Sequence, residues 1–164
     1  MKNILVKKVM TSPIVTVKHD TTLKELLKIL DNNIFSGLPV VDEGERLVGI
    51  ISEKDIMKYT HWVIGQPLKD PAKILEGNNE AAHVIGQRGI DVIELVASAT
   101  AETIMTKNVI TLEEGACILE AVRLMNKNGI NRVPVVDSSG KVKGIVTRAD
   151  ILTMLEEWAT QHFK

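Results

Sequence analysis

Aromatic residues are scarce in this chain, and that scarcity excludes one class of partner. Only 3% of the 164 residues are aromatic, which is too few for the stacking platforms on which single-stranded nucleic acids bind. The formal net charge of −1 gives no electrostatic reason to expect nucleic acid or an anionic membrane as a partner. We therefore expect neither.

Cysteine is nearly absent, and long apolar runs are missing. Cys117 is the single cysteine, so an intramolecular disulfide framework is excluded. No apolar run approaches the roughly 20 residues of a membrane span, and the N-terminus lacks a basic segment followed by an apolar stretch and a cleavage site. The four histidines show no metal-ligand spacing. We expect a cytoplasmic protein without a metal site.

An internal repeat is the dominant feature of the chain. Residues 9–56 recur as residues 104–151 at a constant offset of 95 and without a gap, so that Met10 maps to Met105 and Pro39 to Pro134. A constant offset over this length indicates two copies of one structural unit, each of which buries its apolar face only with the other's help. Two copies predict a pseudo-two-fold axis with two equivalent clefts between them.

Each copy has the pattern β-α-β-β-α. In the first copy, residues 14–17 favour a strand, and Thr22 and Glu25 have the spacing of a capping box at the start of a helix. Residues 38–41 and 47–51 favour a hairpin, and a second helix begins near residue 52. The helical stripe of leucines at 23, 26, 27 and 30 becomes Ile118, Ala121, Val122 and Met125 in the second copy. The predicted fold class is α/β (α+β), with small sheets and helices packed on them.

These patterns predict three segments. They are a first domain at 1–59, an inserted segment at 60–98, and a second domain at 99–164 whose final helix covers 148–163. Short helices are expected in the insertion at 72–75 and 80–85, with a strand or helix at 90–96. Near its start, Trp62 either packs the insertion on the core or contacts a partner, and we favour packing.

The sharpest motif is Gly-x-x-Ser/Thr-x-x-Asp, which occurs at 49–55 and again at 144–150. A carboxylate in the first turn of a helix can accept hydrogen bonds from both vicinal hydroxyls of a ribose. The nearby hydroxyl can reach a phosphate or ribose oxygen, and the free N–H groups of the helix start favour an anion. The same residues can also serve only as a helix cap. Both interpretations stay open, because duplication copies caps as faithfully as sites.

Three repeated elements give the chain a family resemblance. They are the Met-Thr opening at 10–11 and 105–106, the Leu/Val-Pro-Val-Val-Asp strand at 38–42 and 133–137, and the Gly-x-x-Ser/Thr-x-x-Asp ending. With these elements the chain resembles a tandem pair of cystathionine β-synthase (CBS) domains, together called a Bateman module, over about 2–59 and 99–156. The resemblance implies a regulatory sensor of adenosine-containing ligands (AMP, ADP, ATP, S-adenosylmethionine or NAD). It also implies a homodimer.

The resemblance further implies that each cleft draws on both copies. The first pocket would combine Ser52 and Asp55 with Val109, Ile110, Ile130, Asn131 and Arg132. The second would combine Thr147 and Asp150 with Ile14, Val15, Phe35, Ser36 and Gly37.

The two predicted pockets differ in charge. Arg132 suits a phosphate, whereas its counterpart Gly37 is neutral. We hypothesise that the first pocket prefers a phosphorylated nucleotide and that the second tolerates an uncharged or differently charged adenosyl group. The alternative is that Arg132 bridges to a surface acid.

The expected function is a ligand-sensing module with no catalysis and no required cofactor. It would bind an adenosyl compound and signal to a separate effector protein, which is as yet unidentified. The alternative is a structural dimerisation module whose clefts stay unoccupied. An enzyme is the third reading and the least favoured, because the aligned Ser52 and Thr147 have no base nearby in sequence and no catalytic signature is present.

Overall fold

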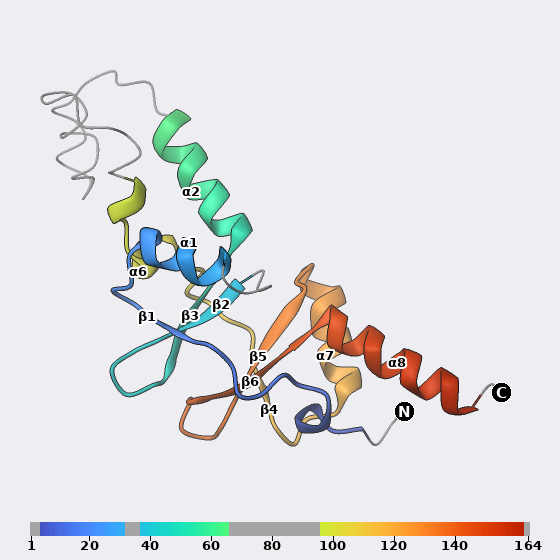
Figure 1. Cartoon of the computed structure of the whole chain (residues 1–164). Helices are drawn as coiled ribbons and strands as arrows, with labels where there is room; N and C mark the ends of the chain where they lie inside the picture. The colour runs from blue at the N-terminus through green and yellow to red at the C-terminus, as the bar shows by residue number, and fades with distance from the viewer. Residues whose placement is uncertain (1–3, 32–36, 66–95, 163–164) are drawn as a thin grey trace, which may run out of the picture. The chain divides into compact units, whose positions relative to one another are not determined.

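The structure, a computed structural model, describes residues 4–31, 37–65 and 96–162 (Figure 1). The elements expected at 72–75 and 80–85, most of the one at 90–96, and the pocket residues Phe35 and Ser36 lie outside the described residues. The chain divides into two compact units. Unit 1 comprises Met1–Thr16, Val41–Gly49 and Lys107–Lys164, and unit 2 comprises Val17–Val40 and Ile50–Thr106.

The first copy of the repeat forms a three-stranded sheet with the order β1-β2-β3. Its elements are β1 (Val17–Lys18), α1 (Leu23–Asp31), β2 (Gly37–Val41), β3 (Leu47–Ser52) and α2 (Glu53–Gly65), and α6 (Ala101–Ile104) follows later in unit 2. The predicted capping box at the start of α1 is confirmed, since a carboxylate oxygen of Glu25 accepts from the backbone N–H of Thr22 at 2.9 Å and from its hydroxyl at 2.8 Å.

The leucine stripe of α1 is only partly buried. Leu23 and Leu26 are buried, at 1% and 0% exposure, but Leu27 is 48% exposed. The prediction of one buried face is therefore wrong at Leu27. This residue lies at the edge of the stripe, about 100° around the helix from its neighbour Leu26.

The second copy forms the sheet β4-β5-β6 of unit 1. Its elements are β4 (Leu112–Glu113), α7 (Ile118–Asn128), β5 (Arg132–Val136), β6 (Val142–Thr147) and α8 (Arg148–His162). Unit 1 also contains η1 (Val6–Lys8), which precedes both copies in the chain. Strand β4 pairs with β5 in parallel, and β5 pairs with β6 in antiparallel register, with Arg132 opposite Thr147. The predicted hairpin and both flanking helices are confirmed in this copy.

The first strand of each copy is shorter than predicted. A strand was expected at 14–17, and the repeat offset of 95 places its counterpart at 109–112, but β1 covers Val17–Lys18 and β4 covers Leu112–Glu113. In unit 1 the ladder with β5 begins only at Leu112, which lies opposite Val135. Residues before it have strand propensity without a ladder partner in that sheet, and propensity alone does not make a strand.

The core of unit 1 combines a residue that precedes the first repeat with residues of the second repeat. Val6, from the N-terminal segment, is fully buried in one cluster with residues of β4, α7, β5 and β6. The helix α7 contributes Ile118, Ala121 and Met125, as the repeat offset predicts. It ends at Gly129, whose φ of +63° favours glycine.

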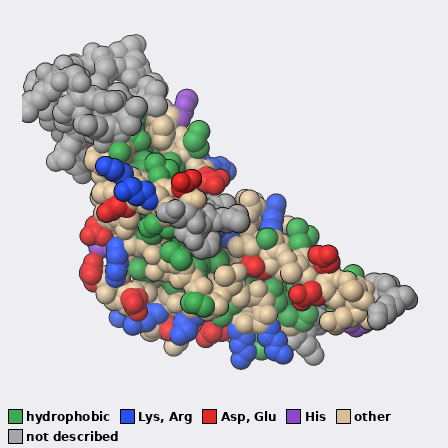
Figure 2. Space-filling view, in the orientation of Figure 1, with side chains coloured by type: hydrophobic (Ala, Val, Ile, Leu, Met, Phe, Trp, Pro, Cys, Tyr) green, Lys and Arg blue, Asp and Glu red, His purple; other side chains and the backbone are tan. Residues whose placement is uncertain are grey.

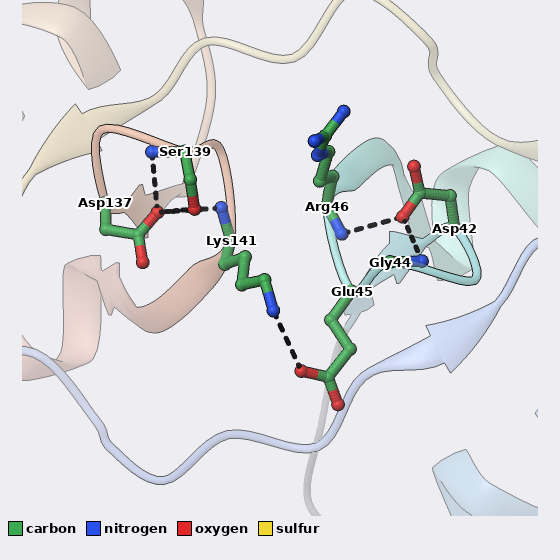
Figure 3. A network of polar contacts seen from close by, with 7 residues as sticks. All are labelled: Asp42, Gly44, Glu45, Arg46, Asp137, Ser139 and Lys141. Carbon is green, nitrogen blue, oxygen red and sulfur yellow. Dashed lines mark hydrogen bonds and ion pairs between the residues drawn. The ribbon is translucent and has the colours of Figure 1, made fainter.

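The tips of the two hairpins face each other inside unit 1 (Figure 3). The carboxylate of Asp42 accepts from the backbone N–H groups of Gly44 and Arg46, at 2.9 and 2.8 Å. That of Asp137 accepts from the N–H groups of Ser139 and Lys141 at 2.9 and 3.1 Å and from the Ser139 hydroxyl at 2.7 Å. Each turn is therefore closed by its own aspartate.

The described surface carries mixed charge. On the face shown in Figure 2, basic and acidic side chains lie interspersed. Helix α8 has no fully buried residue, and its Leu152 is 65% exposed. None of the helices in the described ranges has the length and apolar character that crossing a membrane requires.

Candidate functional site

Each Gly-x-x-Ser/Thr-x-x-Asp motif lies where the last strand of a sheet enters a helix, β3 into α2 and β6 into α8 (Figure 1). In unit 2, one carboxylate oxygen of Asp55, Oδ2, accepts from the backbone N–H of Ser52 at 2.9 Å and from the Ser52 hydroxyl. In unit 1, Oδ2 of Asp150 accepts from the N–H and the hydroxyl of Thr147, both at 2.7 Å. Both motifs are therefore helix caps, as the structural interpretation expects.

The second oxygen of each carboxylate is held by a threonine from the other copy of the repeat. The hydroxyl of Thr106 donates to Oδ1 of Asp55 at 3.1 Å. That of Thr11 donates to Oδ1 of Asp150 at 3.3 Å. We call residues 9–11 and 104–106 the opening segments of the first and second copy. Each opening segment thus belongs to the unit that contains the other copy's motif.

Backbone hydrogen bonds fix the opening segments in place. Thr106 and Ile50 exchange two such bonds, at 2.9 and 3.0 Å, and Thr11 and Ile145 exchange two at 2.9 and 3.1 Å. Gly144 lies directly against the first opening segment. Sequence reasoning treated both threonines only as part of the repeat. Their recurrence at the same offset was the one available signal of a role.

The bonded carboxylates keep some acceptor capacity. A carboxylate offers about four lone-pair sites, and the three bonds to Asp55 occupy both sites of Oδ2 and one of Oδ1. Asp150 is bonded in the same way, and both side chains are half-buried. Each Oδ1 can therefore accept one more hydrogen bond, such as one from a ligand hydroxyl. The described residues hold no group of three or more potential metal ligands.

Most other predicted site residues belong to unit 1. Those half-buried are Ile14, Val109, Ile110, Ile130 and Arg132; Asn131 is exposed and Val15 is 40% exposed. Ile14 and Val15 thus share a unit with Thr147 and Asp150, the pair they were grouped with. Gly37 is buried in β2 of unit 2.

The register of unit 1 bears on the assignment of Arg132. It lies opposite Thr147 in the β5–β6 ladder, and directly opposed residues project from the same face of a sheet. The carbonyl oxygen of the preceding Asn131 accepts from the backbone N–H of Arg148, the first residue of α8, at 3.0 Å. Arg132 was grouped with Ser52 and Asp55. In this structure its ladder neighbour is the hydroxyl residue of the other motif.

The sequence matches the CBS domain family twice, at residues 6–61 and 101–157. The chain belongs to the CBS domain family. This CBS pair is 36% identical to an uncharacterised protein of Methanocaldococcus jannaschii over 92% of this chain and 90% of that protein. It is 33% identical to a CBS domain-containing protein of Dictyostelium discoideum over 93% of this chain and 91% of that one.

Among solved structures, the CBS pair is similar to the CBS domain pair of protein MJ0100 in complex with 5′-methylthioadenosine and S-adenosyl-L-methionine. The TM-score is 0.66 and the identity 32%, over 94% of this chain and 98% of that one. The predicted fold class and tandem arrangement of the two repeats are confirmed.

Proposed function

We propose that this CBS pair is a regulatory module that binds adenosine-containing compounds at its two Gly-x-x-Ser/Thr-x-x-Asp motifs and signals to a separate effector protein. One observation carries the proposal. Asp55 and Asp150 are each fixed by three hydrogen bonds and still hold an open acceptor position on Oδ1. A preorganised carboxylate of this kind suits the hydroxyls of a ribose.

The ligands of the similar protein support this class of compound. That protein was solved with 5′-methylthioadenosine and S-adenosyl-L-methionine. The two molecules differ at the 5′ position and share adenine and a ribose with both vicinal hydroxyls. A site that reads the shared part would depend on the ribose hydroxyls, which is what the two aspartates can accept.

The two sites would differ in their preference for phosphate. We propose that Arg132 acts beside Thr147 and Asp150, because it lies opposite Thr147 in the ladder. A guanidinium recognises phosphate through paired hydrogen bonds, whereas the equivalent position in the first copy is Gly37. Arg132→Ala should weaken AMP binding at this site and leave 5′-methylthioadenosine binding unchanged. Arg123→Ala, on the exposed side of α7, is the control. Equal losses for both ligands would contradict the assignment.

The deciding experiment is calorimetric titration of the full chain with AMP, ATP, 5′-methylthioadenosine, S-adenosylmethionine, NAD and GTP, alongside thermal shifts. A ligand that binds only the native state at 100 times its Kd adds about 2.7 kcal/mol of stability. Asp55→Ala and Asp150→Ala should each remove one site. Each substitution also removes a helix cap, so Glu25→Ala is the matched control: it removes the cap of α1 and lies outside both motifs. Binding that survives in the double aspartate variant would refute the site.

A homodimer is a second proposal, and exposed apolar side chains favour it. Met57 of α2 and Leu152 of α8 lie at equivalent places in the two copies. Their side chains are 67% and 65% exposed, respectively. Soluble monomers tolerate single exposed apolar residues, but repeated ones on equivalent helices suggest a contact. Sedimentation should give a dimer that Leu152→Glu weakens. If the chain is dimeric and no adenosyl compound shifts its melting temperature, the structural dimerisation reading replaces the sensor.

A further inference from the structure

We propose that Thr11 and Thr106 are positioning residues of the two ligand sites. Each would hold the aspartate of the other copy's motif so that its open acceptor position faces the ribose hydroxyls. This inference rests on the proposed function and adds to each site a residue from the opposite repeat. The two hydroxyl–carboxylate bonds, at 3.1 Å and 3.3 Å, are its starting point.

The hydrogen-bond count shows why the threonines matter. Oδ2 of each aspartate is filled by the cap, and Oδ1 carries the threonine bond and the one open position. To bind both hydroxyls of a ribose, a carboxylate must free a second position. The hydroxyl of Ser52 or Thr147 can provide it by rotating toward the ligand. The threonine of the opening segment then keeps Oδ1 in place while the cap is partly released.

The backbone makes the threonines suitable for this role. Two main-chain hydrogen bonds join Thr106 to Ile50, and two join Thr11 to Ile145. Ile50 and Ile145 are strand residues that lie three positions before the first residue of α2 and of α8. The position of each hydroxyl is therefore set before any ligand arrives, which lowers the entropic cost of ordering the carboxylate on binding. Both copies show the same arrangement, so one repeat serves as an internal control for the other.

The role has a structural consequence for sensing. Each aspartate is oriented by the opening segment of the other repeat. A ligand bound at one motif therefore affects the stability of the segment at which the other repeat begins. A ligand that strengthens the threonine–aspartate bond also stabilises the segment that carries the threonine. This gives a ligand a differential contact with a segment outside its own repeat, which regulation by binding requires.

The test distinguishes a threonine that positions the aspartate for the ligand from one that only attaches the opening segment to the motif. Thr106→Val removes the hydroxyl and keeps the shape of the side chain, and Thr106→Ser keeps the hydroxyl. Both are made in an Asp150→Ala background, with Asp150→Asn as the substitute if that background unfolds, so that one site is read. The probes are AMP and 2′,3′-dideoxy-AMP, which lacks the ribose hydroxyls. Thr11→Val in an Asp55→Ala background repeats the test at the other site.

We expect Thr106→Val to weaken AMP binding about tenfold, to leave 2′,3′-dideoxy-AMP binding unchanged, and Thr106→Ser to restore AMP binding. Equal loss for both probes, or failure of the serine variant to restore binding, overturns the positioning role while the proposed function stands. If the parent chain binds no adenosyl compound, the proposed function fails and the positioning role fails with it. A double-mutant cycle of Thr106→Val with Asp55→Ala in chemical unfolding would then identify the contact as structural.

Discussion

A Cβ atom at Gly144 would lie 2.8 Å from the carbonyl oxygen of Thr11, closer than real Cβ contacts come. It would also lie 2.7 Å from the sulfur of Met10. The methionine can move, but the carbonyl belongs to a backbone that exchanges two hydrogen bonds with Ile145. The glycine that opens the second Gly-x-x-Ser/Thr-x-x-Asp motif is thus required by the close passage of the first opening segment.

Gly144→Ala should therefore destabilise the protein by about 1–3 kcal/mol, the usual cost of forcing an extra group into a packed site. The free energy of unfolding measured in urea reports this loss. Gly115→Ala is the matched control, because a Cβ there meets nothing within 4 Å. A Gly144→Ala protein as stable as the control would mean that the opening segment does not lie against β6.

Thr147→Ala should cost about 1 kcal/mol through loss of the α8 cap. Its hydroxyl donates to Asp150 and accepts from the backbone N–H of Asp150 at 3.2 Å. Thr147→Ser should recover most of the stability in thermal unfolding. The hydroxyl of Thr160, later in α8, donates to the carbonyl oxygen of Glu156 within the same helix, so Thr160→Ala should change stability by less than about 0.5 kcal/mol.

Glu45→Gly should stabilise the protein by about 0.5–1 kcal/mol, because Glu45 holds a φ of +64° that favours glycine. The equivalent residue of the second copy is Gly140, with a φ of +81°. The substitution also breaks the ion pair of Glu45 with Lys141, but that pair spans 3.9 Å between exposed side chains and contributes little (Figure 3). Glu45→Gln, which removes the charge and keeps the strain, should leave the urea midpoint nearly unchanged. A lower urea midpoint for Glu45→Gly would contradict the inference that the backbone of Glu45 is strained.

The turn at Asp137 should respond to acid. The hydroxyl of Ser139 chiefly lowers the pKa of Asp137 from its ordinary 3.8, with help from the N–H groups of Lys141 and Ser139. Because the folded pKa is depressed, this carboxylate contributes stability that is present above pH 3.8 and is lost as the pH falls through the folded pKa. Ser139→Ala should raise the pKa of Asp137 toward 3.8, as followed by NMR titration of its carboxyl carbon. Ser138→Ala is the control and should leave the pKa of Asp137 unchanged. An equal pKa of Asp137 in the two variants would exclude the Ser139 hydroxyl as the main cause of the lowered pKa.

The elements of the repeat could be predicted from the sequence because they depend on local signals. The capping box at Thr22 and Glu25 and the stripe at Ile118, Ala121 and Met125 each lie within one helix. The start of β4 could not be predicted, since the ladder position of β5 sets it.

The candidate site divides in the same way. The aspartates and their caps follow from a seven-residue motif. The Thr11–Asp150 bond spans 139 residues, and Arg132 lies opposite Thr147 in the ladder. Neither contact produces a periodic pattern in the sequence. Those contacts depend on which distant segments pair, and one sequence does not encode that pairing in any short window.

The burial of Val6 among residues of the second repeat has a consequence for synthesis of the chain. Val6 leaves the ribosome long before its partners in β4, α7, β5 and β6, so unit 1 cannot close until β6 has emerged. Contacts at such separation slow folding, because the closure entropy must be spent before they form. A nascent chain stalled before β6 would expose the apolar face that Val6 and Val146 cover together, and it would be a natural target for chaperones.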